Sequence, residues 1–276
     1  MYALAAEATG DVGKAVGNMI MHHITDSNQL DLGFATVDLP HVPTFEVAGI
    51  PIDLSLSKTV VFMMLAGVLL FLMALVVRRK AALVPSGLTN FVEAFVLFVR
   101  DDIAAETMGK DAASKYTPYL CTTFFFILTC NLLGLIPLGS SATGNVNVTA
   151  GLAAVAFFTI QFAGIRKLGV GGWLGHLLPP GVPWWLAPVM IVVELLGMFA
   201  KPFALCIRLF ANMVAGHVVI LSLIGLFFIL GWAIAPVTAG FALFMYVLEI
   251  FVSLIQAYVF TMLTSLFIGL LVHGEH

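Results

Sequence analysis

The stretch "AKPFALCIRLFANMVAGHVVILSLIGLFFIL" (200–230) decides the fold, because it is long and apolar enough to cross a membrane and yet contains an arginine. Between Lys201 and Glu249, Arg208 is the only residue that must be charged at neutral pH. An arginine at mid-bilayer depth costs roughly 2.5–3.5 kcal/mol on insertion scales. Arginine also keeps its proton throughout the physiological range. We therefore expect Arg208 to face a polar cavity or an opposite charge, as a fixed charge that cannot relay protons.

The composition of the whole chain is that of a polytopic membrane protein. The chain has 276 residues, of which 61% are hydrophobic and only 10% are charged, against about 25% charged residues in soluble domains. Cys121, Cys130 and Cys206 lie in apolar segments, so we interpret them as small core residues. No zinc spacing, glycine-rich phosphate loop, GxSxG or HExxH occurs. We expect no metal, no cofactor, no nucleic-acid partner and no covalent catalysis.

Residues 1–53 form a polar N-terminal extension, distinct from a transmembrane domain over 54–276. This extension holds seven acids and one lysine, and it lacks the basic start and long apolar core of an intact signal peptide. It is predicted to be loosely ordered or partly helical. His22, His23 and Asp26 allow a metal site in principle, but a solvated helix face is the favoured interpretation.

Five segments are predicted to cross the membrane, which makes the fold all-α. They are 59–77, 117–137, 146–165, about 187–230 and 237–272. The last two would be roughly 50–65 Å long as helices, against a hydrocarbon core of about 30 Å. We expect them to tilt strongly, bend or break, with a turn at Gly231 and Pro236. The Gly- and Pro-rich stretch 169–185 is predicted to be an interfacial loop.

The basic residues set the expected orientation. Eight of the twelve Lys and Arg lie at 78–80, 100, 110, 115, 166 and 167. The positive-inside rule places these positions in the cytoplasm, with the N-terminus outside and the C-terminus inside. Residues 86–106 are amphipathic, with Glu93 and Arg100 opposite Phe95 and other apolar residues. We expect a helix along the cytoplasmic membrane surface, or one packed under a cytoplasmic loop.

Polar residues recur at helical spacing in the two long segments. Glu194, Lys201 and Arg208 are seven residues apart and share one face with small residues, Gly197, Ala204, Ala211 and Ala215, and with Asn212. Small residues alone would favour a helix-packing seam within the protein, whereas Arg208 favours a surface for a partner.

A second polar group is predicted to lie away from the arginine. His217 follows Arg208 by nine residues, about half a turn around the helix. Tyr246, Glu249, Ser253 and Gln256 share a face of the last segment. Either His217 or Glu249 alone is equally well explained as a hydrogen-bonded core group. Together, beside a fixed arginine, they favour an ion pathway.

The motifs "KPFALCIRLFANMVAGH" (201–217) and "EIFVSLIQAYVFTML" (249–263), with Glu194 and "CNLLGLIP" (130–137), resemble the a-subunit family of rotary F-type ATP synthases. The similarity covers roughly residues 58–272. The resemblance implies that Arg208 faces the ring of c subunits and their membrane carboxylate. It implies that His217 and Glu249 form a pair of one histidine and one acid, and that Asn212 and Gln256 are polar positions near the arginine. Glu194 matches an acid of the cytoplasmic-side path. Asn131 matches a polar position, and Gly134 stands where some members have an acid.

The expected function is that of a stator subunit with two proton half-channels, which does no covalent chemistry itself. Protons would enter past His217, Glu249, Ser253 and Gln256, neutralise a c-ring carboxylate, and leave near Glu194 after the ring has turned. The implied partners are the c-ring, b-type peripheral stalk subunits and lipid, with one copy of this chain in a bacterial inner membrane. The alternative is a secondary transporter with a buried arginine for an anionic substrate, which predicts inverted repeats and broken helices.

Overall fold

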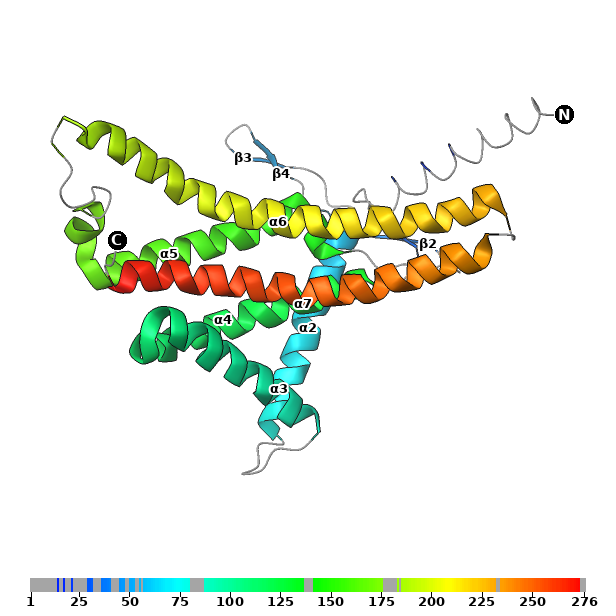
Figure 1. Ribbon diagram of the computed structural model, residues 1–276, viewed down its shortest axis with the longest axis horizontal. Helices are drawn as coiled ribbons and strands as arrows, with labels where there is room; N and C mark the ends of the chain where they lie inside the picture. Colours follow the sequence, from blue (N-terminus) through cyan, green and yellow to red (C-terminus); the bar gives the residue numbers. More distant parts are fainter. Residues whose placement is uncertain are drawn as a thin grey trace. The chain divides into compact units, whose positions relative to one another are not determined.

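The computed structural model describes residues 14, 17, 21, 29–31, 36–40, 45–47, 50–52, 55, 57–79, 87–136, 141–175, 183, 185–231 and 234–273. Its helices in chain order are α2 (Lys58–Arg79), α3 (Leu88–Leu97), η1 (Phe98–Ala105), α4 (Glu106–Gly134), η2 (Ala142–Gly144), α5 (Val146–Gly175), α6 (Ala187–Leu230) and α7 (Ala235–His273) (Figure 1). Among the described residues, five helical stretches are long and apolar enough to cross a membrane. The prediction of an all-α polytopic membrane protein with about five crossing helices is confirmed.

The two long C-terminal segments are each a single helix through the described residues. α6 has 44 residues and α7 has 39, so at 1.5 Å per residue they are roughly 65 and 60 Å long. Pro202 lies inside α6 without ending it. Gly231, which follows α6, has a φ of 77°, a conformation that favours glycine. Pro236 is the second residue of α7, where a missing N–H removes no helical hydrogen bond.

α4 and α5 extend beyond the predicted spans, and each has a glycine kink. α4 begins at Glu106 and bends at Gly109, whose φ is 73°. α5 continues to Gly175 and bends at Gly169, whose φ is 71°. The predicted interfacial loop is therefore wrong for residues 170–175, which are helical. Only glycine adopts such positive φ angles without strain, so each kink falls where the sequence allows a change of direction.

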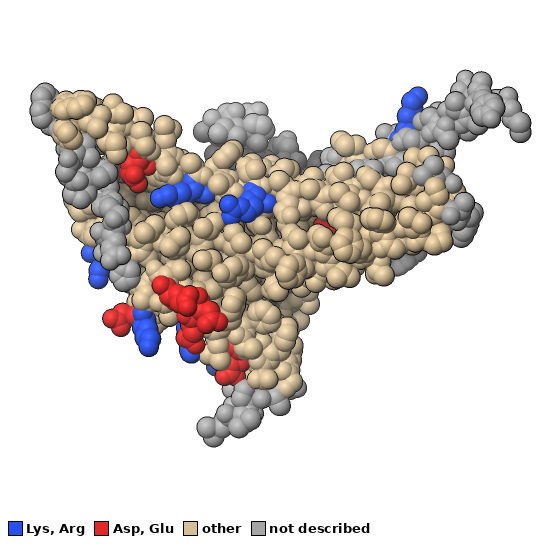
Figure 2. All heavy atoms as spheres, viewed as in Figure 1, with Lys and Arg blue, Asp and Glu red and all other residues tan. Residues whose placement is uncertain are grey.

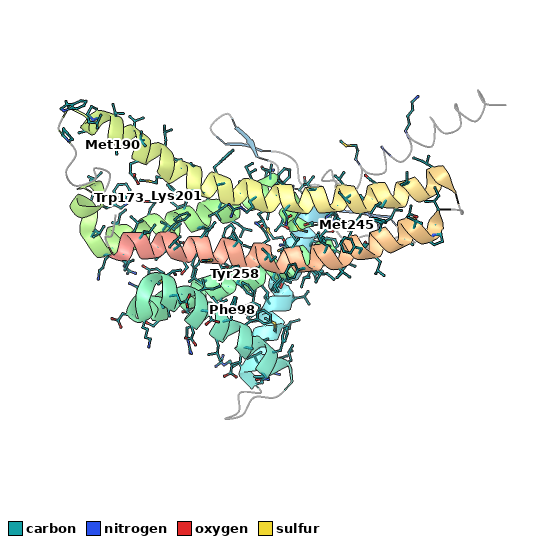
Figure 3. The ribbon with its side chains drawn as sticks, in the orientation of Figure 1. Phe98, Trp173, Met190, Lys201, Met245 and Tyr258 are labelled. Carbon is teal, nitrogen blue, oxygen red and sulfur yellow. The ribbon has the colours of Figure 1, made fainter. Side chains whose placement is uncertain are left out.

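The predicted amphipathic helix is present as α3, followed by a π-helical stretch, η1. Val92 and Val99 are buried, whereas Glu93 and Arg100 are exposed, as the pattern predicts. Phe98 packs on Tyr258 of α7 with 5.8 Å between ring centroids (Figure 3). The inner face of this helix thus packs on protein, and its place at a membrane surface stays a prediction.

The chain divides into two compact units, and each is described by itself. The first unit comprises residues 1–68, 129–145 and 210–254, and the second comprises 69–128, 146–209 and 255–276. In the second unit, α7 approaches α4 closely. The hydroxyls of Thr107 and Ser265 are 2.5 Å apart, and a Cβ added at Gly269 would collide with the carbonyl group of Thr107. A glycine on α7 therefore permits this close packing.

The three cysteines lie wholly or partly inside the protein. Cys130 and Cys206 are buried and Cys121 is half-buried, and all three are free thiols. The hydroxyl of Thr149 lies 3.4 Å from the sulfur of Cys206. These positions agree with the interpretation of the cysteines as small core residues.

Two short antiparallel hairpins lie in the N-terminal extension. β1 (Gln29–Asp31) pairs with β2 (Thr36–Asp38), and β3 (Phe45–Val47) pairs with β4 (Ile50–Ile52). The extension was predicted to be loosely ordered or partly helical, and its strands were not predicted. The metal alternative at His22, His23 and Asp26 lies outside the described residues.

Candidate functional site: a histidine–glutamate pair

His217 of α6 is held at both ring nitrogens. Nδ1 lies 2.9 Å from the carbonyl oxygen of Met213, one turn earlier in α6. Nε2 lies 2.9 Å from the carbonyl oxygen of Gly134, the last residue of α4. A carbonyl oxygen can only accept, and a neutral imidazole carries a single N–H. The ring therefore donates to both carbonyls only when both nitrogens are protonated.

Glu249 of α7 is the acidic member of the pair. Its Oε1 lies 3.3 Å from Nδ1 of His217, and the side chain is only 5% exposed. Neither carboxyl oxygen has a hydrogen-bond partner among the described residues. A buried charge without hydrogen bonds is costly unless it faces an opposite charge. The imidazolium of His217 supplies such a charge, so the protonation states of the two groups are coupled.

The neighbour of His217 on α6 makes room for the carboxyl group. A Cβ added at Gly216 would lie 2.5 Å from Cδ of Glu249 and closer still to its Oε1. The carboxyl group thus lies directly against the bare backbone of α6. A glycine at 216 is what allows Glu249 to reach the imidazole from α7.

A cluster of uncharged polar side chains lies at the end of α4. Thr143 donates to Oδ1 of Asn131 at 2.6 Å, and its hydroxyl lies 3.0 Å from the hydroxyl of Ser141. Asn131 and Thr143 are fully buried, and Nδ2 of Asn131 has no partner among the described residues. Gly134 belongs to the same unit and supplies the carbonyl oxygen that accepts from His217.

The predicted polar face of α7 is buried. Glu249, Ser253 and Gln256 are each at most 5% exposed, and Tyr246 is half-buried. The hydroxyl of Ser253 and Nε2 of Gln256 have no hydrogen-bond partner in the part of the chain that the structure describes. Such groups are uncommon in folded proteins and need an explanation. A stripe of unsatisfied polar atoms is suited to exchange protons or to bind water.

The small-residue face of α6 is largely exposed. Arg208 and Lys201 are exposed, as are Ala204, Ala211 and Ala215, while Glu194, Gly197 and Asn212 are half-buried. Nζ of Lys201 lies 5.1 Å from the centroid of the Phe267 ring. Figure 2 shows basic side chains on the surface over α6, whereas a larger group of charged side chains gathers over the region of α3, η1 and the start of α4. A packing seam within this chain would bury the alanines, so the exposed face favours a surface for a partner.

The structure adds two residues that the sequence-based analysis did not assign to the site. Gly134 was noted only as the absence of an acid, and Gly216 was not considered. Both residues contribute because glycine has no side chain, so a search of the sequence for polar residues does not find them. The small-residue context "AGH" (215–217) directly before the histidine was the available signal for Gly216.

Among the described residues, no three His, Cys, Asp or Glu side chains are grouped so that they could hold a metal ion. The polar groups of the site instead pair one imidazole with one carboxyl group. Such a pair can take up and release protons, and it needs no bound group to do so.

Within the described residues, five apolar helices, with His217 and Glu249 in contact across two of them, define a multi-pass membrane protein. The chain belongs to the ATP synthase A chain family, whose model matches residues 60–269. It is 46% identical over 288 residues to an ATP synthase subunit a of Anaeromyxobacter dehalogenans (strain 2CP-C), covering 98% of this chain and 75% of the relative. It is 47% identical over 277 residues to an ATP synthase subunit a 2 of Chlorobaculum tepidum, covering 96% and 77%. An ATP synthase subunit a of Chlorobium phaeobacteroides (strain BS1) is 48% identical over 262 residues, covering 92% and 75%.

Proposed function

We propose that this chain is the stator subunit a of an F-type ATP synthase, which carries protons to and from a ring of c subunits by two half-channels. The observation that carries the proposal is the contact between His217 and Glu249, 3.3 Å apart on two membrane-spanning helices. Family membership and the relatives named ATP synthase subunit a support the role. The chain itself performs no covalent chemistry, since its task is to move protons.

The outer half-channel runs along the polar face of α7. Protons reach His217 and Glu249, and Ser253 and Gln256 extend the polar stripe towards the ring. The buried, unsatisfied atoms of Ser253 and Gln256 support this path, because they would otherwise be left without hydrogen bonds. A proton that arrives there neutralises a c-ring carboxylate, which can then enter the lipid.

The inner half-channel receives the proton after the ring has turned, with Glu194 as its acid and Asn212 as a polar neighbour of the arginine. Arg208 separates the two half-channels, because its permanent charge excludes a proton and attracts the deprotonated c-ring carboxylate. Its exposure on the small-residue face of α6 supports contact with a partner. One charge that crosses 100 mV supplies about 2.3 kcal/mol, so each ATP requires several protons.

The proposed assembly holds a single copy of this chain, with the c-ring, b-type peripheral stalk subunits and lipid around it. It lies in a bacterial inner membrane. Residues 1–53 are outside with the N-terminus, the channel domain spans 54–276, and the C-terminus is cytoplasmic. The basic residues at 78–80, 166 and 167 support this orientation.

The transporter alternative gains no support. Transporters of that class bind substrate at helices that are interrupted near the middle of the membrane. α6 and α7 carry the polar residues and are uninterrupted helices of 44 and 39 residues.

The test is Arg208→Ala in the assembled complex. We expect ATP-driven pumping to be lost and passive proton leak to rise in vesicles stripped of the catalytic head, because the fixed barrier is gone. Lys201→Ala is the matched control, since it removes an exposed cation from the same face and should leave pumping intact. Normal coupled synthesis by Arg208→Ala would refute the assigned role. As a control for assembly, the complex isolated from Arg208→Ala membranes should still contain the c-ring.

A further inference from the structure

Gly134 and Ser141 lie against each other at the end of α4 in a way that leaves no space for a side chain at 134. A Cβ added at Gly134 would be 2.5 Å from Cβ of Ser141, 2.8 Å from its Oγ and 2.9 Å from its Cα. Real Cβ atoms do not approach other heavy atoms so closely. Gly134 does not have a positive φ, so lack of space, and not backbone conformation, requires the glycine here.

The carbonyl oxygen of the same glycine accepts from Nε2 of His217 at 2.9 Å. The last four carbonyl groups of a helix have no partner within the helix, and they carry its partial negative charge. Gly134 is the last residue of α4. Its carbonyl is therefore free to bind the imidazole, and it is well suited to a ring that carries a positive charge.

We propose that Gly134 is a positioning residue for proton transfer, and that Ser141 is its size-matched partner. Ser141 occupies the space that a side chain at 134 would need, and this close packing sets the place of the carbonyl that holds His217. The inference rests on the proposed function, because it assigns a role in the same proton path. It is additional to that function, since it concerns main-chain and small groups that carry no proton themselves.

Ser141 is itself fixed by its neighbours. Its hydroxyl lies 3.0 Å from that of Thr143, which donates to the buried Asn131. This chain of hydrogen bonds holds the residues after α4 against its last turn. His217 is thus positioned from two sides: by α6 through Met213, and by the end of α4 through Gly134.

The experiment compares four variants by ATP-driven proton pumping per assembled complex. Gly134→Ala should pump about tenfold more slowly, because the new methyl group displaces the carbonyl from the imidazole. Ser141→Gly alone should pump more slowly than the native protein, because it removes the Cβ packed against Gly134 and the hydroxyl that contacts Thr143. Gly134→Ala with Ser141→Gly should recover part of the loss, because the contacts at 2.5 and 2.8 Å are removed while the 2.9 Å contact with the Cα of residue 141 remains.

Gly134→Ala with Ser141→Ala is the matched control. It removes the same hydroxyl but keeps the Cβ that lies 2.5 Å from the added methyl group, so it should not recover. If Gly134→Ala alone assembles poorly, the two double variants still test the proposed packing of Gly134 on Ser141. Of the two, only the variant with glycine at 141 should assemble and pump. Equal behaviour of the two double variants would overturn the proposal, as would native pumping by Gly134→Ala.

A second comparison asks whether the effect passes through the histidine. In a His217→Ala background, Gly134→Ala should cause no further loss of the residual transport, because the carbonyl has no imidazole to hold. A further tenfold loss in that background would mean that Gly134 acts elsewhere, and would refute the positioning role. Native pumping by His217→Ala itself would contradict the proposed function, so the two failures are distinguishable.

Discussion

Exchange of the two members of the pair, as His217→Glu with Glu249→His, should restore part of the proton transport that each single change removes. The two side chains contact each other from different helices, with 3.3 Å between Nδ1 and Oε1. His217→Glu alone places two carboxyl groups in this space, and Glu249→His alone places two imidazoles there. The exchange again provides one acid and one imidazole.

The expected magnitude follows from the distance. Two opposite unit charges 3.3 Å apart attract each other by about 5 kcal/mol at an effective dielectric constant of about 20, and two like charges repel each other equally. Measured couplings between contacting residues are smaller, about 0.5–3 kcal/mol, because groups move or change their protonation. At 1.4 kcal/mol per factor of ten, we expect the exchange to pump roughly 2 to 140 times faster than the product of the single losses predicts.

Recovery should nevertheless be incomplete. The carbonyl oxygens of Met213 and Gly134 both accept hydrogen bonds from the ring of His217 when its two nitrogens are protonated. A carboxylate at 217 has no proton to donate, so both carbonyls lose a partner. The structure therefore predicts that the exchange restores transport only in part, whereas a pair without these carbonyl contacts would be expected to recover completely.

The assay is ATP-driven proton pumping in inverted vesicles, measured over a range of pH for the native protein, both single variants and the exchange. Each rate is divided by the amount of assembled complex, so that a failure to assemble is not counted as lost transport. Strictly additive losses with an unchanged pH profile would show that His217 and Glu249 do not share a pathway.

Three further changes test other parts of the structure. Arg208→Lys should abolish coupled pumping although it keeps a positive charge, because lysine can lose its proton when desolvated; pumping at the native rate would contradict this. Gly216→Ala should slow pumping about 5- to 100-fold at a cost of about 1–3 kcal/mol, since its methyl group would displace the carboxyl group of Glu249, whereas Gly240→Ala, with nothing within 4 Å, should have little effect. Gly269→Ala should reduce the amount of subunit in the membrane, measured by immunoblot, because the new Cβ meets backbone of α4 that cannot yield; normal levels would argue against this packing.

The long helices were predictable because the bilayer imposes a simple rule on the sequence. Apolar runs of sufficient length gave the segments that became α2, α6 and α7 within a few residues. The glycine kinks at Gly109 and Gly169 were not predicted. Each lies where an amphiphilic or glycine-rich stretch joins an apolar helix, and hydropathy alone does not distinguish a kinked helix from a loop there.

The titratable residues of the site were also predictable, because a charge in an apolar segment is conspicuous. Helical spacing placed Arg208 and His217 on different sides of α6, and the polar face from Glu249 to Gln256 is buried as one stripe. The contact between His217 and Glu249 required the structure, since spacing within one helix does not say which groups meet across two. Their roles in transport stay predictions.

The carbonyl of Gly134 could not have been found from sequence. It is a backbone group, 83 residues before the histidine that it binds. Every residue has a carbonyl, so the pattern of residue types contains no signal for the one that is used. The short strands of the N-terminal extension were missed for a related reason: three-residue strands are too brief for an alternating pattern to be recognised.

The two glycines of the site explain why a pair of titratable groups can lie in so little space. Gly216 lets the carboxyl group of Glu249 lie against α6, and Gly134 leaves its carbonyl open to the imidazole. A side chain at 216 would collide with the carboxyl group of Glu249, and a side chain at 134 would collide with Ser141 beside the carbonyl that binds His217. In the proposed function, proton exchange at His217 and Glu249 therefore depends on glycines that lack a side chain as well as on the charged residues. A single methyl group added at Gly134 or Gly216 should therefore slow transport although no charge is removed, and this sensitivity distinguishes a tightly packed proton path from a wide aqueous cavity.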